Sequence, residues 1–342
     1  MKLNRTLLIV ALALCALSVF SYTDSVRRAE RFERGQKFLQ NLNPDSIVEI
    51  LIEKGDESTH LRRDGDRFVV VDADGYPAKN ESVNRFIRDV LDISLEKEVG
   101  TGESLLEELE LVEGGENTTK VVFKDANQAE MVHFLVGKGM DDGGGNYVLR
   151  TDDDDATIYL TSSRAYINTD HDSFLKKEIV NVDQADIAAI QGPGFAIEDQ
   201  DGSLQLVDLP AGKKESSKVG QVKGLLTGLR FTKHYLANAP EIAGLLFDAG
   251  LDIDLKDESG YQVEVANKGD KHYLRIQGFH SAGQLSIALD AGDEETAEVA
   301  DQLKRQNEIQ DFNDFHGSWI YEVTETTADR VRVSARDLVE DA

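Results

Sequence analysis

An internal repeat that covers most of the chain is the feature that most constrains its fold. When residues 43–342 are compared with themselves, the order of turn, strand and helix signals in the first half recurs at an offset of roughly 136 to 140 residues. The turn dipeptide Asp64-Gly65 precedes the apolar run 68–72, and Asp201-Gly202 precedes the matching run 204–208. A pattern that occurs twice predicts two copies of one structural unit.

Each copy also contains apolar residues at i, i+3, i+7 and i+10, which is the spacing of a helix with one buried face. The two sets are Val83, Phe86, Val90 and Ile93, and Val219, Val222, Leu226 and Leu229. Ser82 and Ser217 are the predicted N-caps of these helices. Further matched segments are 105–106 with 245–246, and 134–137 with 274–278.

Strand patterns outnumber helical ones, and they cluster instead of alternating with helices. The predicted strands are 47–52, 131–136, 147–150 and 157–160 in the first copy, and 187–190, 261–266, 272–277, 285–289, 318–323 and 330–334 in the second. This order argues against a doubly wound parallel sheet. We expect an α+β fold with tandem repeats over 43–181 and 182–342, each with one or two helices. The second repeat has an insertion near 283–314, with a polar helix predicted over 294–306.

The first 22 residues differ from the rest of the chain. Lys2 and Arg5 precede an uncharged run from Thr6 to Tyr22, which as a helix would span ~26 Å of a ~30 Å hydrocarbon core. The small residues around Ala16-Leu17-Ser18 leave a cleaved signal peptide as an alternative. We favour a single transmembrane anchor, or signal-anchor, over residues 1–22.

Residues 23–42 are predicted to form a helical stalk beside the membrane. Its basic face consists of Arg27, Arg31 and Arg34, and its apolar face of Ala29, Phe32 and Leu39. Such a stalk would contact lipid head groups or a partner's membrane helices, or would serve as a plain spacer. These readings stay open at this point.

The charge of the chain argues against nucleic acid as a partner, and the distribution of basic residues gives conflicting indications of the membrane orientation. Lys and Arg number 37 against 64 Asp and Glu, which gives a net charge of −27. So acidic a surface repels phosphate, which excludes nucleic acid. Counting basic residues on both sides of the apolar run favours a cytoplasmic body. The short basic start before an apolar run favours export instead, and we expect export.

No motif for catalysis or metal binding stands out, so we predict no catalytic, cofactor-binding or metal-binding residues. The acidic clusters 141–145 and 152–155 lack the alternating ligands of an EF-hand and flank one strand, so we expect solvated hairpin tips. The seven histidines contain no zinc-binding pair at helical spacing. His133 and His272 fall at matched strand positions, which suggests a repeated structural role. The chain has no nucleophile elbow, P-loop or dinucleotide fingerprint.

Two possibilities for a ligand site remain. The aromatic residues Phe315, Trp319 and Tyr321 would line a sugar or peptide groove, or else belong to a core or an interface. With 64 acidic residues, a carboxylate pair for glycoside hydrolysis also stays open, because sequence alone cannot select one.

As a whole the pattern resembles the domain of unknown function 4340 family. The matching features are the apolar run 7–20, the strand 47–52, the run 67–71, Pro77-Ala78 before the helix 83–93, Leu109-Glu110-Leu111, the run 134–137 and Tyr147-Val148. Phe68 departs from the tryptophan-like position expected there, and the insertion in the second copy departs as well. The resemblance supplies no catalytic residues.

The resemblance implies a single-pass protein of the bacterial inner membrane whose bulk is extracytoplasmic, beside the subunits of an ABC transporter. We therefore expect a non-enzymatic, membrane-tethered binding or scaffolding protein that is auxiliary to such a transport system and needs no cofactor. The alternative is an extracytoplasmic substrate-binding protein, or a carbohydrate- or peptide-active enzyme with an unidentified carboxylate site.

Overall fold

The computed structural model is a strand-rich α+β protein with few helices. It describes residues 34–40, 42–151, 156–280 and 293–342. The chain divides into two compact units, Met1–Lys176 and Lys177–Ala342. This division falls five residues before the predicted boundary between 181 and 182.

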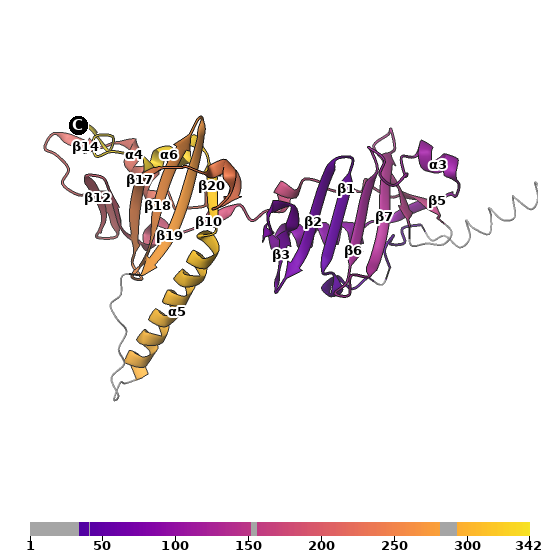
Figure 1. Ribbon diagram of the computed structural model, residues 1–342, viewed down its shortest axis with the longest axis horizontal. Helices are drawn as coiled ribbons and strands as arrows, with labels where there is room; N and C mark the ends of the chain where they lie inside the picture. The colour runs from indigo at the N-terminus through magenta and orange to yellow at the C-terminus, as the bar shows by residue number, and fades with distance from the viewer. Residues whose placement is uncertain (1–33, 41, 152–155, 281–292) are drawn as a thin grey trace, which may run out of the picture. The chain divides into compact units, whose positions relative to one another are not determined.

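The main sheet of the first unit runs in the order β4-β3-β2-β1-β6-β7-β8-β9-β5, and its neighbouring strands are antiparallel. Figure 1 shows β3, β2, β1, β6 and β7 side by side. Its strands are β1 (Glu49–Lys54), β2 (Glu57–Asp64), β3 (Arg67–Val70), β4 (Tyr76–Pro77), β5 (Leu95–Gly100), β6 (Thr119–Lys124), β7 (Glu130–Gly139), β8 (Asn146–Arg150) and β9 (Ile158–Thr161). Consecutive strands are mostly neighbours, since short turns join them. The exception is β5, which follows a helix and pairs with β9 at the far edge.

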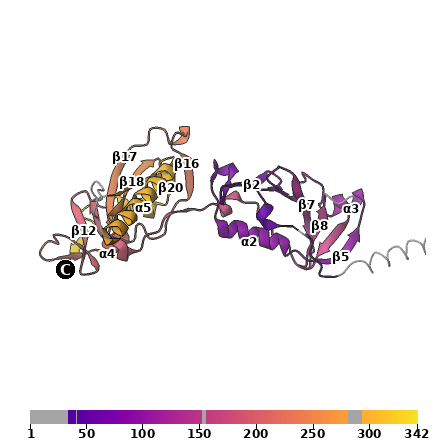
Figure 2. The same cartoon turned by 90° about the horizontal axis from the view of Figure 1, so that it is seen from below.

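One face of this sheet is buried by helix α2 (Asn80–Leu91), which Figure 2 shows along one side of the unit. Val83, Phe86 and Val90 of α2 are buried, as the predicted spacing requires. The ring of Phe86 meets that of Phe123 on β6 edge-on, with centroids 6.2 Å apart. Ser82 lies inside the helix, whose N-cap is Lys79, so the predicted cap is wrong. A short helix, α3 (Glu103–Glu108), and the loop after it cover part of the opposite face.

The main sheet of the second unit runs in the order β13-β12-β11-β17-β18-β19-β20-β16. Its strands are β11 (Ile187–Gly192), β12 (Phe195–Gln200), β13 (Ser203–Leu206), β16 (Lys233–Leu236), β17 (Phe247–Leu255), β18 (Ser259–Lys268), β19 (Lys271–His280) and β20 (Trp319–Val323). Two small sheets pair β10 (Glu178–Val180) with β15 (Leu229–Arg230), and β14 (Lys213–Glu215) with β21 (Val339–Asp341).

The helices of the second unit differ from the predicted ones. Helix α4 (Ser217–Lys223) has its N-cap at Ser216, and it ends at Gly224, so Leu226 and Leu229 lie beyond it. Both are buried nonetheless, which explains the helical spacing in the sequence. Helix α5 (Asp293–His316) is longer than predicted and projects beyond the sheet (Figure 1). Helix α6 (Glu325–Val331) stands where a strand was predicted over 330–334.

Apart from the edge strand β4, which has no counterpart in the second unit, the two main sheets have the same strand order. If β1, β2 and β3 are set equal to β11, β12 and β13, then β6 to β9 correspond to β17 to β20, and the edge strand β5 corresponds to β16. The chain adds α5 between β19 and β20, where the first unit has the loop between β8 and β9. This order corrects the predicted match of 134–137 with 274–278, since β7 corresponds to β18 and not to β19. His133 and His272 are therefore not at matched positions.

Each unit begins with an extended arm that pairs beside this edge strand. In the first unit the N–H of Phe38 donates to the carbonyl of Ile93 (2.9 Å), and the N–H of Leu95 donates to Gln36 (2.9 Å). In the second unit the N–H of Phe231 donates to Lys177 (3.1 Å), next to the β10–β15 pair. Residues 34–40 are thus not helical, which corrects the last part of the predicted stalk.

Several predictions concern residues that the structure does not describe. The anchor over 1–22, most of the stalk, the strand 285–289 and the acidic cluster 152–155 all lie outside the described residues. Among the residues that are described, no helix is both long enough and apolar enough to cross a membrane.

Candidate binding cleft

An open cleft lies in the second unit where β19 and β20 separate. In the described part of the chain these strands pair from His272 to Leu274, opposite Val323 to Tyr321. Beyond Leu274 the gap becomes a cleft of about 680 Å³, between residues 275–277, the start of β20, the end of α5 and the loop after β16. This volume lies within the roughly 300–1,000 Å³ that is common for ligand sites.

Asn313, near the end of α5, takes the place of a strand at the far end of the cleft. Its side-chain N–H donates to the carbonyl of Gly278 (2.8 Å), and its side-chain carbonyl accepts from the N–H of Gly278 (2.7 Å). These bonds satisfy main-chain groups that β20 would otherwise pair with. A Cβ at this position would lie 3.0 Å from the side chain of Ile309 on α5, so the glycine lets the helix pack close to β19. The helix therefore separates the strands without leaving the β19 edge unsatisfied at Gly278.

An ion pair forms part of the lining of the cleft. Arg275 on β19 donates two hydrogen bonds to Glu264 on β18, at 2.6 and 3.0 Å, and both residues line the cleft. The guanidinium also lies 4.4 Å from the centre of the Phe247 ring. The hydrogen bonds with Glu264 raise the pKa of Arg275, although burial opposes this. A bidentate, stacked pair of this kind fixes both side chains, so Glu264 acts as a charge partner.

Two more carboxylates lie on β17, next to the cleft. Gln262, which lines the cleft, donates to Asp252 (3.0 Å), and Gln191 donates to Asp254 (3.2 Å). Alternate residues of a strand share one face, so these carboxylates are neighbours. Burial and the charge of Asp252 raise the pKa of Asp254, and the bond from Gln191 opposes the rise. Both carboxylates lie on β17, across β18 from the cleft, and only the glutamine that contacts Asp252 is part of the lining.

The three aromatic residues that the sequence proposed for a groove or a core lie in different environments. Trp319 lines the cleft, although it is largely buried. Tyr321 lies fully in the core, where its ring stacks on Phe231 at 5.3 Å between centroids and its hydroxyl lies 2.6 Å from Nδ1 of His316. Phe315 packs against Trp319 at 6.3 Å. The core interpretation is thus confirmed for Tyr321, whereas a sugar or peptide groove at Trp319 stays a prediction.

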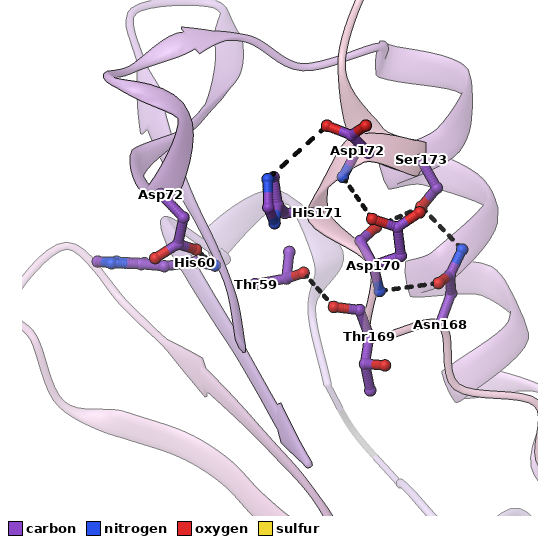
Figure 3. A network of polar contacts seen from close by, with 9 residues as sticks. All are labelled: Thr59, His60, Asp72, Asn168, Thr169, Asp170, His171, Asp172 and Ser173. Carbon is purple, nitrogen blue, oxygen red and sulfur yellow. Dashed lines mark hydrogen bonds and ion pairs between the residues drawn. The ribbon is translucent and has the colours of Figure 1, made fainter. Parts of the chain in front are cut away.

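A polar network in the first unit fastens a loop to β2 (Figure 3). Thr59, which is almost fully buried, donates from Oγ1 to the carbonyl of Thr169 (2.8 Å). Asp170 accepts from the N–H of Asp172 (3.0 Å), and Nε2 of His171 lies 3.7 Å from the Asp172 carboxylate. These bonds shape a turn and hold it on the sheet. The role that these contacts support is structural.

The acidic clusters and histidines do not form a metal site in the residues that the structure describes. No group of three or more His, Cys, Asp or Glu residues there could hold a metal ion. Asp142 accepts from the N–H of Gly144 (3.0 Å) in the turn between β7 and β8. His133 lies between Glu113 and Glu130, at 3.6 and 3.5 Å, whereas His272 contacts Asn267 at 2.9 Å.

Sequence reasoning missed the ion pair of the cleft, although a signal for it exists. Lys268 faces Lys271 across the two-residue turn Gly269-Asp270. This register places Glu264 opposite Arg275, and opposite charges at facing positions favour such a pair. Asn313 had no comparable signal, because its partner Gly278 is 35 residues away and the helix between them was predicted to be shorter.

The comparisons with known proteins give one positive result. A family model described as "Domain of unknown function (DUF4340)" matches residues 69–240, about half of the chain. No curated protein and no solved structure matches. The matched range begins in the first unit and ends in the second.

Proposed function

Because the chain belongs to the family of the domain of unknown function DUF4340, we propose that it is a non-enzymatic, membrane-tethered binding or scaffolding protein. In this proposal it works outside the cytoplasm as an auxiliary of an ABC-type transport system. The observation that carries the binding role is the open cleft beside β19. Its charged residues, Arg275 and Glu264, form an ion pair with each other. A carboxylate held in such a pair is poorly suited to proton transfer, so the arrangement favours recognition.

The tether is supported by the basic and apolar N-terminal sequence, which lies outside the described residues. Near the start of the described residues, Gly35 is already held by the first unit, since its N–H donates to the carbonyl of Leu95 (2.8 Å). About a dozen residues separate it from Tyr22, a reach of at most ~40 Å when fully extended. A tether this short would hold the first unit close to the membrane and raise its effective concentration near membrane partners.

The enzyme alternative has one carboxylate in its favour. Burial raises the pKa of Asp254, as expected for a general acid. Asp254 is, however, already bound to Gln191, and Glu264 is bound to Arg275. If Asp254 were a catalytic acid, Asp254→Asn would abolish turnover of a carbohydrate or peptide substrate that the wild-type chain cleaves.

In-cell photocrosslinking tests the proposed partner. A photoreactive amino acid replaces Leu246, an 81 % exposed residue beside the cleft, in the full chain. We expect an adduct with a permease subunit of an ABC transporter. The control position is Tyr166 in the first unit, which is also 81 % exposed. Adducts at Tyr166 do not depend on the cleft.

The tether is tested on chain extracted from the membranes of the same cells. The intact mass of the membrane-extracted chain should include Met1. A mature N-terminus at Val19 or Tyr22 would exclude the anchor. Absence of any permease adduct, in cells that contain the transporter, would exclude the partner.

A further inference from the structure

We propose that the cleft binds a neutral ligand through one cis amide group, a primary carboxamide or a ring lactam, which pairs with the main chain of Ile276. This inference rests on the proposed binding role of the cleft, and it names the chemical group that the cleft recognises. It follows from the position of Ile276 in the lining, from the way Asn313 binds the same strand, and from the balance of charge in the cleft.

Ile276 presents its main chain to the cleft. The residue is buried, yet it belongs to the lining together with its neighbours Arg275 and Gln277. Side chains alternate between the two faces of a strand, so the side chain of Ile276 lies on the opposite face from those of Arg275 and Gln277. The groups that Ile276 contributes to the cleft are therefore its N–H and its carbonyl.

These two groups point toward β20 at a place where the pairing with β20 has ended. Gly278 bonds Asn313 with both its N–H and its carbonyl, so these groups point away from β18. In an antiparallel strand, every second residue directs its main-chain groups to the same side, so those of Ile276 point the same way. The described pairs between β19 and β20 end at Leu274, and the cleft lies beyond them.

The open stretch of this edge is one residue long on the side that faces β20. Leu274 is paired with Tyr321, and Gly278 is bound by Asn313, so Ile276 lies between two occupied positions. An added strand would gain one residue's pair of hydrogen bonds here. A single small group that carries one donor and one acceptor would gain the same pair, and it does not need room for a strand.

Asn313 shows which group fits one residue of this edge. Its carboxamide donates to the carbonyl of Gly278 (2.8 Å) and accepts from the N–H of Gly278 (2.7 Å). A primary carboxamide can make both bonds because one of its N–H groups lies on the same side as its carbonyl, and a ring lactam has the same arrangement. A trans secondary amide holds its N–H and its carbonyl on opposite sides, so it can make only one of the two bonds.

The charges of the lining favour a neutral ligand. Glu264 and Arg275 are joined by two hydrogen bonds, so their opposite charges balance. Gln262 and Gln277, which face each other on β18 and β19, add uncharged amides to the lining. A charged ligand would have to disrupt the pair of Glu264 and Arg275 to gain an ionic partner there.

Nuclear magnetic resonance of the full chain in nonionic detergent, with isoleucine labelled by a heavy nitrogen isotope, tests the inference. The probe is nicotinamide, a neutral primary carboxamide on a small ring. We expect nicotinamide to shift the amide signal of Ile276 downfield, because the N–H gains an acceptor. Ile276→Val removes this signal and so assigns it. N-methylnicotinamide, a trans secondary amide, should bind about tenfold more weakly through the loss of one hydrogen bond.

Further probes test the charge of the ligand and the source of its amide. Nicotinate has a carboxylate in place of the carboxamide and should leave the Ile276 signal unchanged. N-acetylglutamine N-methylamide carries the carboxamide of a protein side chain, and N-acetylmethionine N-methylamide is its control without that group. Either source supports the inference. Tighter binding of the glutamine compound than of nicotinamide assigns the amide to a partner protein, and the reverse order assigns it to a free small molecule.

Variants place the binding in the cleft. Ala237→Trp fills the cleft that Ala237 lines, and we expect at least about a tenfold loss of affinity for nicotinamide. The same change at Ala126, exposed in a turn of the first unit, should have no effect.

The outcomes separate this inference from the proposed function. An Ile276 signal that does not respond to nicotinamide, equal binding of nicotinamide and its N-methyl analogue, tighter binding of nicotinate, or no effect of Ala237→Trp would each overturn the inference. The crosslinking experiment at Leu246 tests the transporter partner without any of these probes, so either proposal can fail while the other stands.

Discussion

Individual polar side chains hold this fold together at points where main-chain pairing stops. Asn313 satisfies Gly278 at the split between β19 and β20, and Asp337 joins the C-terminal segment to α4. Thr59 does the same for the loop after β9 in the first unit. Each side chain joins segments that are distant in the sequence, so each is a point where one substitution has a measurable effect.

Replacing Asn313 should destabilise the second unit. Asn313→Ala leaves two main-chain groups of Gly278 without their partner, which should lower the free energy of unfolding by about 2 kcal/mol. Asn307→Ala is the matched control, since Asn307 is exposed on the same helix. Urea unfolding of both variants measures the difference. Equal, small effects of the two changes would show that water replaces the Asn313 amide.

Asp337 should make a contribution to stability that depends on pH. Hydrogen bonds from Ser334 and from Lys218 lower its pKa to about 2. The folded state therefore favours the carboxylate, and this stabilisation is complete above the ordinary pKa of the group, about 4. It decreases as the pH falls from about 4 to 2. Since the side chain is 39 % exposed, we discount the effect to about 1 kcal/mol.

The corresponding variant is Asp337→Asn. We expect it to be less stable than the wild type by about 1 kcal/mol at pH 7, with the difference shrinking between pH 4 and pH 2. Denaturant unfolding at several pH values measures this. A difference that stays constant down to pH 2 would mean that the carboxylate charge is not what stabilises the segment.

At the scale of elements, the extended arms define where each unit begins. Phe38 and Leu39 are buried in the first unit, as Ile179 is in the arm of the second. The ring of Phe38 meets Phe134 of β7 edge-on at 5.4 Å. The predicted stalk over 23–42 therefore includes part of the folded unit, and a chain that begins at Asn43 lacks it.

Removing this arm should destabilise the first unit. Phe38→Ala should cost about 3–4 kcal/mol through lost burial and the cavity left behind. Gln36→Ala, whose main chain makes the neighbouring bond, should cost little. A chain that begins at Arg34 should match the full chain in thermal unfolding, and one that begins at Asn43 should not. Identical midpoints for these two chains would show that the arm is dispensable.

Element types were predictable from the sequence where burial alone sets the pattern. The alternating residues of β1 and the apolar face of α2 led to correct elements, because each buries one face. The pattern failed at Leu226 and Leu229, which are buried from a turn and a strand at helix-like spacing. It failed again at Val331 and Val333, where α6 and the segment after it bury residues that alternate like a strand.

At the scale of the whole molecule, the repeat accounts for most of what the sequence could predict. Equal strand order in both sheets gives the detected offset a physical basis, and we propose that the units are copies of one repeat. The cleft was not predictable, because it depends on how α5 separates β19 from β20. That separation is set by Asn313 and Gly278, whose contact is a matter of three-dimensional packing.

The two units should unfold independently, since each has its own sheet and its own buried residues. Val121 on β6 and Val263 on β18 are fully buried valines, one in each unit, so the same substitution can be made in both units. Val121→Ala should cost roughly 2 kcal/mol. The slowest amides of the first unit should then exchange about 30-fold faster, and those of the second should keep their rates. Val263→Ala should give the converse result. Hydrogen exchange read by mass spectrometry assigns each effect to its unit, and equal acceleration in both units by either change would show that the chain unfolds as one cooperative body.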